Sequence, residues 1–247
     1  MSTTPFLLEV IVCSLADAIA AEAGGATRLE VISHYELGGL TPSLELVQGI
    51  VDKVKTPARV MLRESEPFVL PQTAEGEKEA ERLCDLARSF SALPIDGFVL
   101  GFLQPVGNQF QIDHSLVARI LSAAPTVNTT FHRAFEDLPD PLAALAELKR
   151  HPQIDWVLSR GKGEAWAQEL DRFAVWEQAA RPEIGMLLGG GTDADAIRLF
   201  CRHTPLRAFH VGRAVREGER LDGPVQAEKV RALRELLESE NPLNSLV

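Results

Sequence analysis

A histidine and an arginine stand together at the end of one apparent strand. The segment Asn128–Phe135 reads Asn-Thr-Thr-Phe-His-Arg-Ala-Phe, which places His132 and Arg133 after a short apolar run. Imidazole titrates near neutral pH and serves as an acid, a base or a metal ligand. Because charged and titratable groups are costly in a core unless they are paired, the pair indicates a functional site. A hydrogen-bonded core histidine is the alternative.

Two carboxylates lie within the first two apparent strands. Glu9 and Glu30 are each flanked by apolar residues, so each needs a cation or a hydrogen-bond donor nearby. Three arginines are the candidate partners: Arg59, Arg63 and Arg133. In one interpretation these residues form a buried ionic layer that only fills the interior. In the other, Glu30, Arg63 and His132 surround a small polar ligand.

The second interpretation assigns roles to these side chains. His132 or Glu30 would move a proton, and Arg63 would stabilise negative charge that develops on a substrate. Arg133 and Glu9 would line the same ligand site. The sequence therefore predicts catalytic groups at His132, Glu30 and Arg63.

A glycine-rich segment near the carboxyl terminus suggests a place for an anion. Gly190 and Gly191 lie in the run Gly189–Asp193, and Gly212 and Arg213 follow the next apparent strand. Glycine lets backbone amides approach a ligand closely, and the start of a helix favours negative charge. We expect these four residues to bind an anion such as phosphate, although a tight turn would also explain the glycines.

The sulfur-containing residues suggest a different ligand. Cu(I) prefers cysteine and methionine, assisted by imidazole. Cys13 ends the first apparent strand, which in a closed barrel lies beside the last strand and His210, so these two are the candidate metal ligands. Cys84 and Cys201 fall within helical patterns, where buried and inert thiols are expected.

The elements that must position these groups alternate regularly along the chain. Eight apolar runs read as strands: Leu7–Cys13, Arg28–Ile32, Ala58–Arg63, Gly97–Gly101, Val127–His132, Trp156–Ser159, Ile184–Gly189 and Ala208–Val211. Eight amphipathic stretches read as helices: Leu15–Ala23, Ser43–Val54, Glu75–Ser91, Ser115–Ala123, Asp140–His151, Glu164–Arg181, Asp193–Thr204 and Gln226–Glu240. This alternation predicts an α/β fold of the TIM (β/α)8-barrel type, a single domain with the barrel over about residues 7–240. An open doubly wound sheet is the competitor, but no Gly-rich dinucleotide fingerprint follows the first strand.

Local signals place the ends of several helices. Ser43 and Asp193 occupy N-cap positions, and Asp140 precedes a proline at the first turn of a helix. Gly24 and Gly25 close the first helix with residues suited to a left-handed C-cap.

Composition narrows the class of protein. The 247 residues are 45% hydrophobic and 24% charged, with a net charge of −10, which argues against a nucleic-acid-binding surface. The three cysteines form no CxxC pair, which is typical of a reducing compartment. The sequence shows no membrane-spanning apolar run and no basic signal region, so we expect a cytoplasmic protein that is not bound to a membrane.

The motifs together resemble those of the CutC family. The matching segments run in order along residues 7–212: Ala21–Ala26, Arg28–Glu30, Gly38–Ser43, Val60–Arg63, Asp96–Gly101, Thr130–Phe135, Gly189–Gly191 and Phe209–His210. The resemblance implies a TIM barrel, a cytosolic location, frequent dimerisation and an association with copper homeostasis, including binding of copper ions.

The sequence departs from the family pattern at positions that matter for copper. Ile11 and Ile32 stand where family members commonly have cysteine, and arginines have been gained at Arg160 and Arg213. These changes favour an anionic ligand over a soft cation. Three hypotheses follow: a copper-binding protein without catalysis, an enzyme that acts on a small anionic or phosphorylated metabolite, and a noncatalytic barrel that binds a protein partner.

Overall fold

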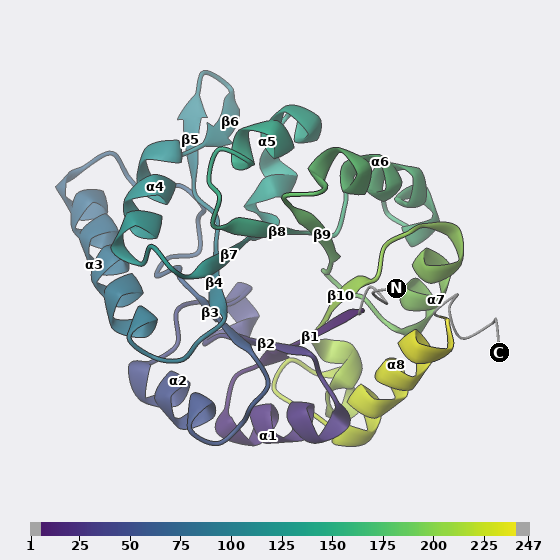
Figure 1. The fold of residues 1–247 in the computed structure, drawn as a ribbon. Helices are drawn as coiled ribbons and strands as arrows, with labels where there is room; N and C mark the ends of the chain where they lie inside the picture. Colours follow the sequence, from purple (N-terminus) through teal and green to yellow (C-terminus); the bar gives the residue numbers. More distant parts are fainter. Residues whose placement is uncertain (1–5, 241–247) are drawn as a thin grey trace.

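Residues 6–240, the part of the chain that the computed structural model describes, contain a closed barrel of parallel strands inside a ring of helices (Figure 1). The barrel strands are β1 (Leu7–Val12), β2 (Arg28–Val31), β3 (Ala58–Met61), β4 (Gly97–Leu100), β7 (Asn128–Phe131), β8 (Ile154–Ser159), β9 (Gly185–Leu188) and β10 (Ala208–Val211). The helices are α1 (Leu15–Gly24), α2 (Leu44–Val51), α3 (Ala74–Ser91), α4 (His114–Ala123), α5 (Pro141–Leu148), α6 (Leu170–Ala180), α7 (Ala194–His203) and α8 (Ala227–Ser239). The predicted barrel is confirmed.

The strands close in the order β1-β10-β9-β8-β7-β4-β3-β2, so the first and last strands of the barrel are neighbours. Glu9 of β1 is in register with His210 of β10 on one side and with Arg28 of β2 on the other. This closure brings together residues from the two ends of the sequence.

Side-chain caps fix the starts of several helices, as the sequence predicts. Ser43 accepts a hydrogen bond from the Leu46 amide at α2, and Asp193 accepts one from the Ala196 amide at α7. Gly25 adopts a left-handed conformation with φ of 88° after α1, which suits glycine because it lacks a Cβ. No helix within residues 6–240 is both long and apolar enough to cross a bilayer.

A hairpin that the sequence reading did not anticipate interrupts the alternation after β4. Strands β5 (Leu103–Val106) and β6 (Gln109–Ile112) pair antiparallel and project from the barrel beside α5 (Figure 1). The two-residue turn Gly107-Asn108, with a φ of 60° at Gly107, is a typical hairpin signal. The predicted helix Glu164–Arg181 also begins later, because a short 3-10 turn, η3 (Trp166–Gln168), precedes α6.

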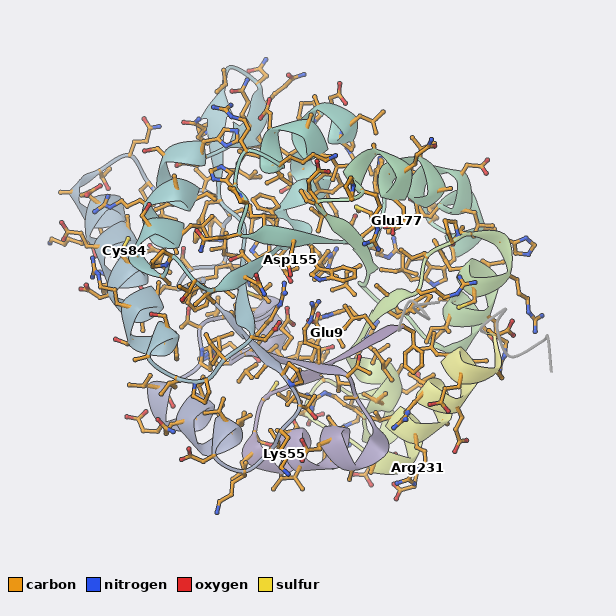
Figure 2. The ribbon with its side chains drawn as sticks, viewed as in Figure 1. Glu9, Lys55, Cys84, Asp155, Glu177 and Arg231 are labelled. Carbon is orange, nitrogen blue, oxygen red and sulfur yellow. The ribbon has the colours of Figure 1, made fainter. Side chains whose placement is uncertain are left out.

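The barrel interior contains charged side chains among its apolar ones. Figure 2 shows Glu9 inside the ring of strands, and the side chains of Arg28, Glu30 and Arg59 are buried there too. Arg59 lies toward the amino-terminal ends of the strands, where it donates to Asp155 at 2.6 and 2.7 Å. It also donates to Asp96 and Thr130, both at 2.8 Å. This network ties β3 to the strands across the barrel floor and leaves the opposite end open.

Candidate active site at the barrel mouth

The carboxyl ends of the barrel strands surround a cavity of about 780 Å³. (β/α)8 barrels generally place their active sites at this end. Nine residues singled out from the sequence line the cavity: Glu30, Arg63, His132, Arg133, Gly190, Gly191, His210, Gly212 and Arg213. Glu9 and Cys13 are not among its lining residues.

Glu9 is a fully buried carboxylate with two cationic partners. Arg28 donates from Nε to Oε2 of Glu9 at 2.5 Å, and His210 donates from Nδ1 to Oε1 at 2.7 Å. Although burial acts in the opposite direction, Arg28 and His210 lower the pKa of Glu9 to about 2. Glu9 is therefore ionised and holds His210 in one orientation.

Two of the three arginines expected to pair with the buried carboxylates pair elsewhere, and the third, Arg63, acts on Glu30 through its positive charge. Arg59 pairs with Asp96 and Asp155 at the barrel floor, and Arg133 pairs with Glu136. The register of β1 with β2 places Arg28 next to Glu9, and the sequence reading did not include this arginine.

Glu30 lies at the cavity and lacks a tight partner. Its Oε2 is 3.7 Å from Nε2 of His210, and its Oε1 has no hydrogen-bond partner among residues 6–240. Burial, against the opposing charge of His210, raises the pKa of Glu30 to about 7. Near neutral pH this carboxyl group populates both protonation states, as a general acid or base must.

His132 is buried at the end of β7 and lines the cavity. Its Nδ1 accepts a hydrogen bond from the Ala134 amide at 3.0 Å, and its ring lies against Phe68 with centroids 4.7 Å apart. Burial, together with the positive charge of Arg63, lowers the pKa of His132 to about 3. The ring is therefore neutral at physiological pH.

Arg63 holds a loop over the mouth. Its Nε donates to the carbonyl of Gly39 at 3.0 Å and its Nη2 to the carbonyl of Leu37 at 2.6 Å. Both carbonyls belong to the segment after β2, which includes the 3-10 turn η1 (Tyr35–Leu37). Arg63 thus positions this loop as well as contributing positive charge to the cavity.

Arg133 is largely neutralised by its own neighbour. Its guanidinium makes two hydrogen bonds of 2.9 Å to the carboxylate of Glu136. Both residues lie on η2 (Arg133–Asp137), three positions apart. Of the two adjacent residues His132 and Arg133, His132 has a buried polar atom, Nε2, without a partner among residues 6–240, whereas Arg133 is half exposed and paired with Glu136.

The two glycine-containing loops meet at the cavity. Within the described chain, no hydrogen bond uses the amides of Gly190 and Gly191, and no side chain caps η4 (Arg213–Val215). Gly191 has a φ of 111° and open space where a Cβ would be. Arg213 is exposed and makes no ion pair within residues 6–240. These amides and this guanidinium are available to an anion.

Gly212 has an additional structural reason to be glycine. A Cβ at this position would overlap the hydroxyl of Tyr35, which comes from the loop after β2. Tyr35 in turn packs against Arg216, whose guanidinium carbon is 5.3 Å from the ring centroid. The loops after β2 and β10 therefore interlock at the mouth.

Cys13 does not line the cavity, although it packs in one cluster with Ile11 and Tyr35, which do. Its Sγ is 3.6 Å from Nη2 of Arg216, and burial raises the pKa of its thiol to about 11. Among residues 6–240, the cluster of potential ligands with atoms within 4.8 Å of one another is Glu9, Glu30 and His210, without Cys13. Two carboxylates and an imidazole do not fit Cu(I), which prefers sulfur, and His210 and Arg28 already neutralise Glu9.

Two further residues, Arg28 and Phe68, contribute to the site. Arg28 shares the inward face of β2 with Glu30 two positions later, a period-two signal that was present in the sequence. Phe68 packs on His132 and lies 5.4 Å from the guanidinium of Arg63, yet it comes from the irregular loop after β3. No local sequence pattern predicts a contact between a loop residue and a strand residue far along the chain.

Comparison with known sequences gives the family. The sequence model of the CutC family matches residues 6–215. The chain belongs to the CutC family. A CutC family protein from Xanthomonas axonopodis pv. citri is 31% identical over 203 residues, which cover 82% of this chain and 81% of the relative. The human copper homeostasis protein cutC homolog is 33% identical over 196 residues, covering 79% and 69%.

The fold of this CutC chain also agrees with a solved structure. CutC from Streptococcus agalactiae superposes with a TM-score of 0.73 at 22% identity, over 84% of this chain and 98% of that one. At this identity the likeness concerns the barrel architecture alone. The CutC match ends at Val215, so it includes every residue predicted here for the site.

Proposed function

We propose that the barrel mouth is the active site of an enzyme that acts on a small anionic, phosphorylated metabolite. The observation that carries the proposal is Glu30, a buried carboxyl group with a free oxygen and a pKa of about 7 beside a 780 Å³ cavity. A buried carboxyl group with this pKa serves proton transfer at neutral pH.

The anionic part of the substrate would bind between the loops after β9 and β10. The amides of Gly190 and Gly191, together with Gly212 and the exposed Arg213, supply donors and positive charge there. Of the acidic residues that line the cavity, Glu66, Glu136 and Asp137 come from other loops, whereas Asp193 and Glu219 belong to the loops after β9 and β10. The anion is expected where the glycine amides and Arg213 provide donors, at this glycine-arginine cradle.

The proton-carrying part is built around Glu30 and its neighbours. In its ionised form Glu30 accepts a proton from the substrate, and the adjacent His210, held by Glu9, stabilises the ionised carboxylate. Arg63 adds positive charge and keeps the loop after β2 closed over the mouth. The substrate would be enclosed between this loop and the cradle.

The anion site is tested by calorimetric titration with inorganic phosphate. We expect saturable binding that weakens about tenfold or more in Arg213→Gln, because one charge-assisted contact is lost. Arg198→Gln is the matched control, since Arg198 is a paired surface residue of α7. Equal phosphate affinity in both variants would contradict the cradle.

The proton-transfer role is tested by NMR in D2O with a panel of phosphorylated sugars and keto acids. We expect solvent deuterium to enter at least one compound with the wild-type protein, and the rate to fall by about a hundredfold or more in Glu30→Gln. Glu45→Gln on the exposed side of α2 should exchange at the wild-type rate. Equal rates in Glu30→Gln and wild type would rule Glu30 out.

Copper handling is the second candidate, favoured by the names of relatives such as the human copper homeostasis protein. For this chain we regard it as the weaker proposal, because the carboxylate-rich cluster at the mouth suits Cu(I) poorly. Competition for Cu(I) with a chelator tests it. Tight binding that Cys13→Ala or His210→Ala abolishes would support a copper site, while unchanged affinity in both variants would remove these ligands. Dimerisation and cytosolic location stay predictions.

A further inference from the structure

The hydrogen bonding of His132 determines which ring nitrogen carries the proton. The Ala134 amide donates to Nδ1 at 3.0 Å, so Nδ1 has no hydrogen of its own. A neutral imidazole with an unprotonated Nδ1 carries its proton on Nε2. His132 therefore presents an N–H group, and not a lone pair, from Nε2.

The surroundings of His132 keep the ring in this neutral form. Its charged neighbours are the cations Arg63 and Arg133, and both disfavour a proton on Nδ1. The aromatic rings of Phe68 and Phe131 flank it, with centroids 4.7 and 6.3 Å away. The ring is thus fixed as a donor across the physiological pH range.

The Nε2 of His132 is a buried donor without a partner among residues 6–240. Leaving such a buried donor unpaired is unfavourable, so an acceptor on a ligand is expected. His132 and Glu30 line the same cavity, and Oε1 of Glu30 also lacks a partner within the described chain. One unpaired donor and one unpaired carboxylate oxygen therefore serve a single cavity.

We infer that Nε2–H of His132 donates to the carbonyl oxygen of a substrate whose adjacent carbon loses a proton to Glu30. This inference rests on the proposed function and narrows its substrate class. The substrate is a carbonyl compound with a hydrogen on the neighbouring carbon and a phosphate or similar anion held by the glycine-arginine cradle.

The step balances without a further reactant. The Glu30 carboxylate takes the proton, and the electron pair of that C–H bond forms a carbon–carbon double bond. The carbonyl π pair moves to oxygen, and the resulting enolate oxygen accepts the hydrogen bond from His132. Glu30 then returns a proton to the same carbon, and the carbonyl re-forms, so the cycle exchanges that hydrogen with solvent.

This arrangement excludes two other roles for His132. A general base needs a free lone pair facing the substrate, but Nδ1 is occupied by the Ala134 amide and Nε2 is protonated. An anion-binding imidazolium requires protonation of a ring that is buried beside Arg63. A neutral hydrogen-bond donor is the role that remains.

Two related compounds and two variants test the inference. Phosphoglycolate carries a phosphate and a carboxylate, and phosphoglycolohydroxamate has in place of that carboxylate a planar hydroxamate that mimics an enolate. His132→Gln places an amide N–H near the position of Nε2, whereas His132→Phe keeps an aromatic ring without a donor. Thermal unfolding of each variant checks that it is folded.

We expect the wild-type protein to bind the hydroxamate about tenfold or more tightly than phosphoglycolate, as one strengthened hydrogen bond would give. His132→Phe should lose this preference while retaining phosphoglycolate, and His132→Gln should recover part of it. If neither compound nor phosphate binds, the proposed function fails. If both compounds bind and His132→Phe keeps the preference, only the role of His132 is overturned.

A spectroscopic readout separates this role from a structural one. Two-bond 1H–15N spectra should show His132 with a protonated Nε2 and an unprotonated Nδ1, unchanged between about pH 5.5 and 8.5. The hydroxamate should move the Nε2 proton downfield. A His132 signal that titrates near neutral pH, or that carries its proton on Nδ1, would overturn the inference.

Discussion

Nε2 of His210 lies 3.7 Å from Oε2 of Glu30, and both side chains line the cavity at the barrel mouth. On its other side, His210 donates from Nδ1 to Glu9. Although burial opposes it, Glu30 and Glu9 raise the pKa of His210. One imidazole therefore links a permanently ionised carboxylate in the interior to a carboxyl group that titrates near neutral pH at the mouth.

Glu9→Gln should destabilise the protein by about 3–5 kcal/mol, because it leaves the buried guanidinium of Arg28 without its carboxylate. Denaturant unfolding at neutral pH measures the loss. The double variant Glu9→Gln/Arg28→Met removes both charges and should recover part of the stability. A double variant no more stable than Glu9→Gln would argue against this pairing.

Stability should fall as the pH rises from about 4.5 to 7. Burial raises the pKa of Glu30 from 4.5 to about 7, so the folded state binds a proton that the unfolded state has released. The raised pKa of His210 acts in the same direction. The contribution of Glu30 is on the order of 2–3 kcal/mol. A plot of the free energy of unfolding against pH should be flatter for Glu30→Gln than for the wild type. Parallel plots for the two proteins would contradict the raised pKa of Glu30.

Arg63→Met should loosen the loop after β2, since the carbonyls of Leu37 and Gly39 lose their donors. Hydrogen exchange of the Ser33 and Leu40 amides, which pair with each other's carbonyls, should speed up by about tenfold or more. Arg213→Gln should leave both amides protected. Unchanged exchange in Arg63→Met would show that the loop does not depend on this arginine.

Gly212→Ala should lower the free energy of unfolding of the protein by about 1–3 kcal/mol, because the new methyl group overlaps the side chain of Tyr35. Removing that side chain relieves the overlap. Gly212→Ala should therefore have little further effect in a Tyr35→Ala background, as thermal unfolding of the four proteins would reveal. If the stability losses of Gly212→Ala and Tyr35→Ala simply add, the overlap with Tyr35 is not the cause of the Gly212→Ala loss.

The fold could be predicted from the sequence because few folds are compatible with a regular alternation of strands and helices. Eight apolar runs separated by amphipathic stretches predict right-handed strand–helix units, and the ends of helices such as α2 and α7 have strong cap signals at Ser43 and Asp193. The hairpin at Gly107-Asn108 was missed because its strands are short and mostly exposed, with one buried apolar residue in each, Leu103 and Ile112.

The site was harder to read because its chemistry depends on register and loops. The sequence placed Glu30 and His132 at one end of the barrel, but it could not show that the Ala134 amide fixes the tautomer of His132. It offered Arg59 as a partner for the carboxylates, whereas strand register gives that place to Arg28. Such differences of one or two positions along a strand decide which charges meet.

The most direct measurement is a pH titration of the Glu30 carboxyl carbon by 13C NMR, with Glu30→Gln used to assign the signal. The proposed site predicts a main transition near pH 7, with a smaller inflection from the coupled His210. A single transition near pH 4.5, the value of an ordinary glutamate, would contradict the claim that Glu30 carries a proton at the barrel mouth.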